Sequence, residues 1–492
     1  MTQRLKELCD RTNGVDSLSL TSISLSHFSE FGDWFGQAFQ EVEELNIKCP
    51  TLVSIPEAPF LSCLSALEIK DCSALKSLWQ VIEHSACLDR LVIEGCDTLK
   101  SVAEGQLPSS LKRLQISSCA NLLCLFDDGQ ANHINASLLE YLYVSECTAL
   151  KCLSSRGQLS EALQQLEVQN CSELTTIGQL PETLKRLDIK TCHKLHSLSS
   201  SGQLPASLEY LSIDDSPITT LSSTGHLPAS LQHLNIEFCS KLTSLSSGQL
   251  PATLKYLKIN SCGILSSIAD GLQNLSNLQQ INISNCPSLE SFPQGSLPRT
   301  SLTVFSISSC VKLNALPSSM HTLNSLQELH ILNLTSLSSF PQQGFPINLT
   351  SLSITSLRIY AQVMQRLHKL TSLRNLHIGG CENAVSFPQE GMEMMLPTSL
   401  TRLTITNFRK LRRLSLEGFR NLDSLECLSI SWCPKLTSFL EKDLPSSLLE
   451  LYISNCSKLT VHCGHGGRYW SNISNIPYVK IDGKYIHETR PV

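Results

Sequence analysis

The side chains best able to do chemistry in this chain are its 21 cysteines. Thiols can form disulfides, bind a metal or attack a substrate, and each role needs a particular arrangement of partners. A regular row of thiols instead favours a structural role, in which each fills a small buried space and donates a weak hydrogen bond. Disulfides between stacked thiols are the alternative. Thirteen of the cysteines share one position of a repeated phrase: Cys72, Cys96, Cys119, Cys147, Cys171, Cys192, Cys239, Cys262, Cys286, Cys310, Cys381, Cys433 and Cys456.

The segment His462-Cys463-Gly464-His465 has the residue types of a metal site. Its two histidines and one cysteine are too close in the sequence to surround one tetrahedral ion, and no second pair of ligands lies nearby. The sequence also contains no phosphate-binding loop, no Gly-x-Ser-x-Gly turn and no paired metal ligands at helical spacing. We therefore expect no catalytic residues, no cofactor and no metal, and we do not expect an enzyme.

The cysteines belong to a phrase, Leu-x-Ile-x-x-Cys-x-x-Leu, that recurs eighteen times. Most copies follow one another after 23 or 24 residues, which is the period of leucine-rich repeats. Apolar and polar residues alternate around Leu211 and Ile213, and this alternation predicts a short strand in each copy. We predict an α/β-type repeat solenoid, a leucine-rich-repeat horseshoe with a parallel β-sheet on its concave side. The copies begin at residues 45, 67, 91, 114, 142, 166, 187, 211, 234, 257, 281, 305, 329, 352, 376, 403, 428 and 451.

The segments that return from one strand to the next are rich in Gly and Pro, as in Gly-Gln-Leu-Pro at 202–205. Because Gly and Pro oppose long helices, the convex side should consist mostly of loops and 3₁₀ turns. Leucine spacings at 270–278 and 318–326 also allow a helical turn. Three parts are predicted: an N-terminal cap or first irregular repeat at 1–44, a solenoid of about 18 coils at 45–462, and a C-terminal cap at 463–492. Five aromatic residues are expected to cover the first coil, and a surface that packs on an upstream domain is the alternative. They are Phe28, Phe31, Trp34, Phe35 and Phe39.

The composition argues against several classes of partner. A formal net charge of −5 gives no electrostatic reason to expect nucleic-acid binding. No run of about 18 apolar residues is present, so no transmembrane helix is expected. The first ten residues lack the apolar core of a signal peptide, which favours a cytoplasmic location.

The outward strand positions differ from copy to copy and are the candidates for binding. They are rich in charged and aromatic residues from the fifth to the tenth copy, and bulky groups return near the C-terminus. Protein interfaces use aromatic and arginine side chains on a rigid surface as anchors. A solvated strand face with incidental aromatic residues is the alternative. The candidate partner-binding residues are Tyr141, Tyr143, Arg186, Asp188, Lys190, Tyr210, Asp214, His233, Glu237, Tyr256, Lys258, Trp432 and Tyr452.

The repeat phrase, joined by Leu-Pro-x-Ser-Leu, resembles the repeat region of plant intracellular disease-resistance receptors of the coiled-coil NB-ARC class. The segment 32–52 is similar to a Trp-containing long repeat of that region, and 463–483 resembles its closing segment. The resemblance implies a recognition module of plant innate immunity that binds a pathogen effector or a guarded host protein on its concave face. In a full receptor it would also restrain an intramolecular nucleotide-binding domain. The phosphate loop and Met-His-Asp motif of that domain are missing from the sequence, so the chain resembles only the C-terminal part of such a receptor.

Two other functions are compatible with a repeat solenoid. A stand-alone adaptor that recruits substrates to a ubiquitin ligase would use the same face, but it needs a ligase-binding helical module, and residues 1–44 are short for one. An extracellular receptor or wall-enzyme inhibitor would be expected to carry a signal peptide and pairs of capping cysteines, and neither is evident.

Overall fold

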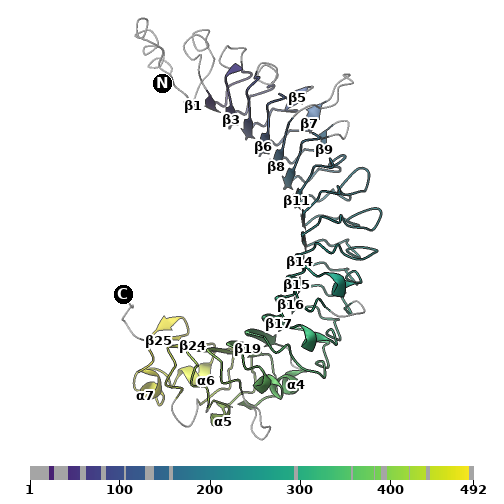
Figure 1. Ribbon diagram of the computed structural model, residues 1–492. Coiled ribbons are helices and arrows are strands. Elements are labelled where there is room, and N and C mark those ends of the chain that lie inside the picture. The colour runs from purple at the N-terminus through teal and green to yellow at the C-terminus, as the bar shows by residue number, and fades with distance from the viewer. Residues whose placement is uncertain are drawn as a thin grey trace. The chain divides into compact units, whose positions relative to one another are not determined.

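The computed structural model describes residues 22–26, 43–55, 62–78, 85–104, 107–127, 138–154, 159–292, 297–355, 358–381, 383–388, 396–419, 421–438 and 444–486. The aromatic residues expected to cap the first coil, from Phe28 to Phe39, lie outside these ranges. The chain divides into two compact units, Met1–Leu242 and Thr243–Val492. Each unit is a stack of coils in which one strand is followed by a return segment (Figure 1).

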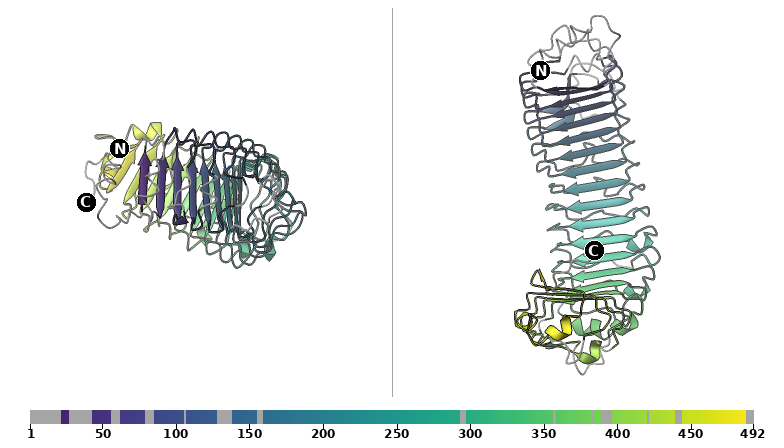
Figure 2. Two further views of the ribbon diagram at one scale, coloured as in Figure 1. Left: turned by 90° about the horizontal axis from the view of Figure 1, so that it is seen from above. Right: turned by 90° about the vertical axis from the view of Figure 1, so that its left-hand side faces the viewer.

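The main sheet of the first unit consists of parallel strands that pair in chain order, and Figure 2 shows them side by side. Its strands are β1 (Ser22–Ser26), β2 (Glu44–Lys48), β3 (Ala66–Lys70), β4 (Arg90–Glu94), β6 (Arg113–Ser117), β8 (Tyr141–Ser145), β10 (Gln165–Gln169), β11 (Arg186–Lys190), β12 (Tyr210–Asp214) and β13 (His233–Glu237).

The main sheet of the second unit is built in the same way, and it ends with an antiparallel pairing of β25 with β26. Its strands are β14 (Tyr256–Asn260), β15 (Gln280–Ser284), β16 (Val304–Ser308), β17 (Glu328–Leu332), β18 (Ser351–Thr355), β19 (Asn375–Gly379), β21 (Arg402–Thr406), β23 (Cys427–Ser431), β24 (Glu450–Ser454), β25 (Tyr478–Ile481) and β26 (Lys484–Tyr485).

The predicted repeat solenoid with a parallel sheet is confirmed. Each of the eighteen predicted starts is the second residue of a strand, from Leu45 in β2 to Leu451 in β24. The second and fourth residues of these strands are buried, as Leu211 and Ile213 are, so the first, third and fifth point outward. Strands β1 and β25 lie outside the range 45–462 and pair with β2 and β24.

The return segments carry more regular structure than the sequence indicates. The 3₁₀ turns η2 (Leu272–Asn274) and η3 (Met320–Thr322) lie in the two stretches where a helical turn was predicted. In Figure 1 the short strands β5 (Ala103–Glu104), β7 (Cys124–Asp127) and β9 (Cys152–Ser154) lie on the side of the coils opposite the main sheet. The elements that were not individually predicted are α4 (Tyr360–Met364), η4 (Leu367–Lys369), α5 (Leu416–Phe419), α6 (Ser457–Thr460), α7 (Trp470–Ile473), β5 (Ala103–Glu104), β7 (Cys124–Asp127), β9 (Cys152–Ser154), β20 (Ser386–Phe387) and β22 (Arg413–Leu414).

The recurring cysteines lie at the bend that follows each strand. A residue with positive φ, such as Asn170 at 54°, turns the chain out of the strand, and the buried cysteine comes next. The thiol typically donates to the carbonyl two residues earlier, as Cys147 Sγ does to Ser145 at 3.4 Å. The twenty cysteines among the described residues are free thiols. Burial raises the pKa of Cys171 to about 12 and that of Cys192 to about 11, so both remain protonated at neutral pH.

Ser216 occupies the cysteine position of its coil and shows what the position contributes. Its Oγ accepts a hydrogen bond from the buried Cys192 N–H at 3.2 Å and donates to the Asp214 carbonyl at 3.1 Å. The thiol of Cys72 accepts the N–H of Cys49 in the same way, at 3.3 Å. The side chain therefore links one coil to the preceding one.

Replacing Ser216 by alanine should lower the free energy of unfolding by about 1–2 kcal/mol, because the Cys192 N–H would be buried without an acceptor. Ser216→Cys is the matched control and should recover most of this loss. Urea unfolding followed by circular dichroism measures both. Equal stabilities of Ser216→Ala and the parent protein would contradict the linking role.

Candidate functional site

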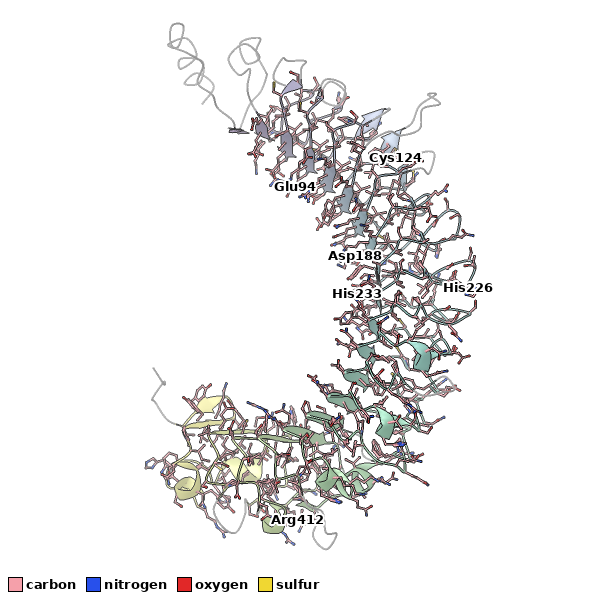
Figure 3. All side chains as sticks on the ribbon, in the orientation of Figure 1. Glu94, Cys124, Asp188, His226, His233 and Arg412 are labelled. Carbon is pink, nitrogen blue, oxygen red and sulfur yellow. The ribbon has the colours of Figure 1, made fainter. Side chains whose placement is uncertain are left out.

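The outward side chains of the first unit form straight rows because its strands pair in register. Side chains at equivalent positions of adjacent parallel strands lie about 4.8 Å apart and can contact one another. Figure 3 places Asp188 and His233 on the strand side of the coils and His226 on the opposite side. Across β11, β12 and β13, the first row is Arg186–Tyr210–His233, the middle row Asp188–Ser212–Asn235 and the last row Lys190–Asp214–Glu237.

Asp188 is the electrostatic centre of this surface. Its carboxylate is buried although it occupies an outward position, because the two cations on either side of it in β11 fold over it. Its Oδ2 lies 3.3 Å from Arg186 Nη2 and 3.3 Å from Lys190 Nζ. Arg186 Nε also lies 3.4 Å from Glu167 Oε1 on β10. The buried Asp188 Oδ1 has no hydrogen-bond partner. The charges on β10 and β11 thus hold the Arg186 side chain in place.

The first row continues from Arg186 as a stack of flat groups. The Arg186 guanidinium lies over the Tyr210 ring, with Cζ 3.8 Å from the ring centroid. The Tyr210 and His233 rings are 5.8 Å apart, centroid to centroid, at an interplanar angle of 37°. Cation–π contacts of this kind are favourable and fix both groups. Side chains that are already held lose little further freedom when a partner binds, so this stack is a preorganised anchor.

The last row gives the surface an acidic edge. Burial raises the pKa of Asp214, and the neighbouring Glu237 and Asp215 raise it further. In the middle row, Asn235 Nδ2 donates to Ser212 Oγ at 3.2 Å and to Glu237 Oε1 at 3.0 Å. The Asn235 Oδ1 atom is buried and has no hydrogen-bond partner. The surface therefore carries a basic, aromatic row and, at its other edge, a row of one lysine and two carboxylates.

The remaining candidate residues lie on other strands. Tyr141 and Tyr143 are half-buried on β8, in the first and middle rows of the first unit. Tyr256 and Lys258 are exposed on β14, where the Tyr256 hydroxyl donates to Gln279 Oε1 at 3.0 Å, and Tyr452 is half-buried on β24. The structure thus brings together the candidates from β8 to β13, whereas those on β14 and β24 belong to the second unit.

Two bends carry bulky aromatic residues where most others carry Asn, Ser, Asp or Gly. Trp432, a candidate from the sequence, follows β23 with φ 55° and is 61% exposed. Phe238, which the sequence analysis did not single out, follows β13 with φ 52° and is 50% exposed. Large side chains are unfavourable in this left-handed region. Its exposure at this bend makes Phe238 a further candidate at the edge of the first unit's surface.

A cavity of about 390 Å³ on the same face of the first unit was also missed. The cavity lies on β4, β6, β8 and β10, and the outward residues of these strands supply most of its lining. The signal was present in the sequence, since the third and fourth copies both place arginine immediately before the first leucine. The lining residues are Arg90, Arg113, Gln115, Glu140, Tyr141, Gln164 and Gln165.

Metal-binding clusters and membrane-spanning helices are both absent from the residues that the structure describes. Among them, no group of three or more His, Cys, Asp or Glu side chains is arranged to hold a metal ion. No helix within those ranges is both long enough and apolar enough to cross a membrane.

Comparisons with known proteins agree with the repeat pattern. Residues 33–177 match the family described as plant disease resistance protein RPS2-like, leucine-rich repeats. This chain is 39% identical over 92 residues to a protein of Arabidopsis thaliana that is named as a disease resistance protein. The matched residues are 19% of this chain and only 6% of that protein. The resemblance of the repeats to those of plant disease resistance proteins is therefore confirmed.

Two solved structures with a similar backbone path come from Yersinia and Leptospira. YopM of Yersinia enterocolitica WA-314 has a TM-score of 0.49 and 20% sequence identity, over 92% of this chain and 93% of its own. A leucine-rich-repeat protein of Leptospira interrogans has a TM-score of 0.43 and 17% identity, over 97% of this chain and 98% of its own.

Proposed function

We propose that this leucine-rich-repeat chain, whose repeats match those of plant disease resistance proteins, binds a protein partner on the sheet face of its first unit. The observation that carries the proposal is the Arg186–Tyr210–His233 stack, which the buried Asp188 holds in place. Arginine and tyrosine are enriched among the residues that dominate binding energies. In plant defence the partner would be a pathogen effector or a host protein that the receptor guards.

The same chain would have a second role within a longer receptor. The match covers only 6% of the Arabidopsis relative, so a protein of that kind has room for further domains. We propose that contacts with the repeat region hold a nucleotide-binding domain of such a receptor inactive until the partner binds. The basic first row and the carboxylates of the last row support this proposal, because charges of both signs fix the orientation of a docked domain.

The test compares two double variants in partner capture. Arg186→Ala/Tyr210→Ala should weaken capture of an effector or host protein by about tenfold or more, because two anchors are lost. Arg412→Ala/Tyr485→Ala removes the same residue types from exposed positions in the second unit and should leave capture unchanged. Circular dichroism establishes that both variants are folded. Unchanged capture by a folded Arg186→Ala/Tyr210→Ala variant would rule out this surface.

A further inference from the structure

The cavity on β4–β10 places two arginines next to each other. In the pairing of β4 with β6, Arg90 lies directly opposite Arg113. Tyr141 lies opposite Arg113 on the next strand, and Gln165 lies opposite Tyr141. Four neighbouring strands therefore contribute one continuous row of polar side chains to the wall of the cavity.

Without a bound anion, the pair of Arg90 and Arg113 is unfavourable for the stability of the fold. Like charges directly opposite each other on paired strands are destabilising. Asp89 and Lys112, which directly precede the two arginines in the sequence, form an ion pair with each other at 3.4 Å. Arg90 makes no ion pair with any residue that the structure describes. Glu140 is the one carboxylate among the lining residues, so the cavity keeps an excess of positive charge. An anion placed between the two guanidinium groups would offset their repulsion.

The rest of the lining supplies further hydrogen-bond donors. Burial raises the pKa of Tyr141, and Glu167 raises it further, so the phenol stays protonated and can donate. The amide groups of Gln115, Gln164 and Gln165 add donors around the cavity. The cavity is partly open to solvent, and its volume of about 390 Å³ falls within the range of small-molecule sites. The site therefore suits a planar anion attached to a larger group.

We propose that this cavity binds the carboxylate of an aspartate or glutamate side chain in an acidic segment of the protein partner. The proposal rests on the proposed function and names the chemistry of the partner that the first unit recognises. Guanidinium groups bind carboxylates through paired, charge-assisted hydrogen bonds, so Arg90 and Arg113 would be the primary contacts. Because the whole chain has a formal charge of −5, net charge does not attract an acidic partner, so the attraction has to come from local cationic groups such as Arg90 and Arg113.

The test uses a fluorescein-labelled hexaglutamate peptide and fluorescence anisotropy with the full chain, at about 50 mM salt so that screening is modest. Arg90→Gln/Arg113→Gln should weaken binding by about tenfold or more, because both primary contacts lose their charge. Arg374→Gln/Arg412→Gln is the matched control; it changes the net charge equally at exposed positions of the second unit and should alter affinity by less than about twofold. Arg90→Gln relieves a like-charge contact, so we expect the cavity variants to fold, and thermal melting checks this.

Three results would overturn the proposal. They are no binding by the parent protein at about 1 mM peptide, an equal loss of affinity in both double variants, and tighter binding of a matched phosphoserine peptide than of hexaglutamate. The test is also separate from that of the proposed function. If the peptide binds through the arginines but Arg186→Ala/Tyr210→Ala captures partners normally, the carboxylate site stands and the protein-recognition surface fails. If capture is lost but the peptide does not bind, only the carboxylate site fails.

Discussion

Replacing both Arg186 and Lys190 by methionine should lower the free energy of unfolding by about 3 kcal/mol, because Asp188 would be left buried without a cation. The Asp188 side chain is 3% exposed, and both cations lie 3.3 Å from its Oδ2. Methionine retains much of the apolar length of the two side chains, so the loss reports the missing charges rather than missing packing. Urea unfolding at neutral pH measures the effect.

The opposite deletion should cost much less. Asp188→Asn removes the buried charge, while Arg186 and Lys190 are 35% and 39% exposed and can return to water. The loss should therefore be about 1 kcal/mol or less. A larger loss in Asp188→Asn than in the double variant would contradict this account.

Most of the fold could be predicted from the sequence because the apolar pattern of each strand is local and repeated. Leu211 and Ile213 alternate with outward residues, and all the remaining copies show the same alternation. The short return strands could not be predicted, because they are held by backbone pairing, as between Cys124 and Cys152, which leaves no side-chain period. Helix α4 did leave a signal. Tyr360, Val363 and Met364 are buried at helical spacing, followed by Leu367 in η4.

The candidate site was predicted in part. Alternation identifies outward residues such as Tyr210 and His233, and register places them in one row once the copies are aligned. The same alignment would have revealed Arg90 opposite Arg113. The burial of Asp188 could not be read from the pattern, because it depends on the conformations of the long side chains two residues away on each side.

Replacing Leu187 by alanine should lower the stability of the first unit by about 3 kcal/mol and weaken partner binding by about tenfold. Leu187 is fully buried on β11, between Arg186 and Asp188, so the cavity left by the truncation lies directly beneath the stack. Coils of a solenoid contact only their neighbours, and a local loss of packing therefore raises local opening. Hydrogen exchange should become faster in β10–β12 first, and partner capture measures the effect on binding.

Leu352→Ala is the matched control, because Leu352 is fully buried at the same position of β18 in the second unit. It should cost about the same free energy of unfolding, since the same side chain is removed from an equivalent environment. Binding should nevertheless change by less than about twofold, because the weakened packing lies outside the coils that hold the Arg186–Tyr210–His233 stack. Equal stability losses with unequal binding losses would locate recognition on the first unit. Equal binding losses would instead mean that partner binding depends on the stability of the whole solenoid, and the first unit's surface would lose its special role.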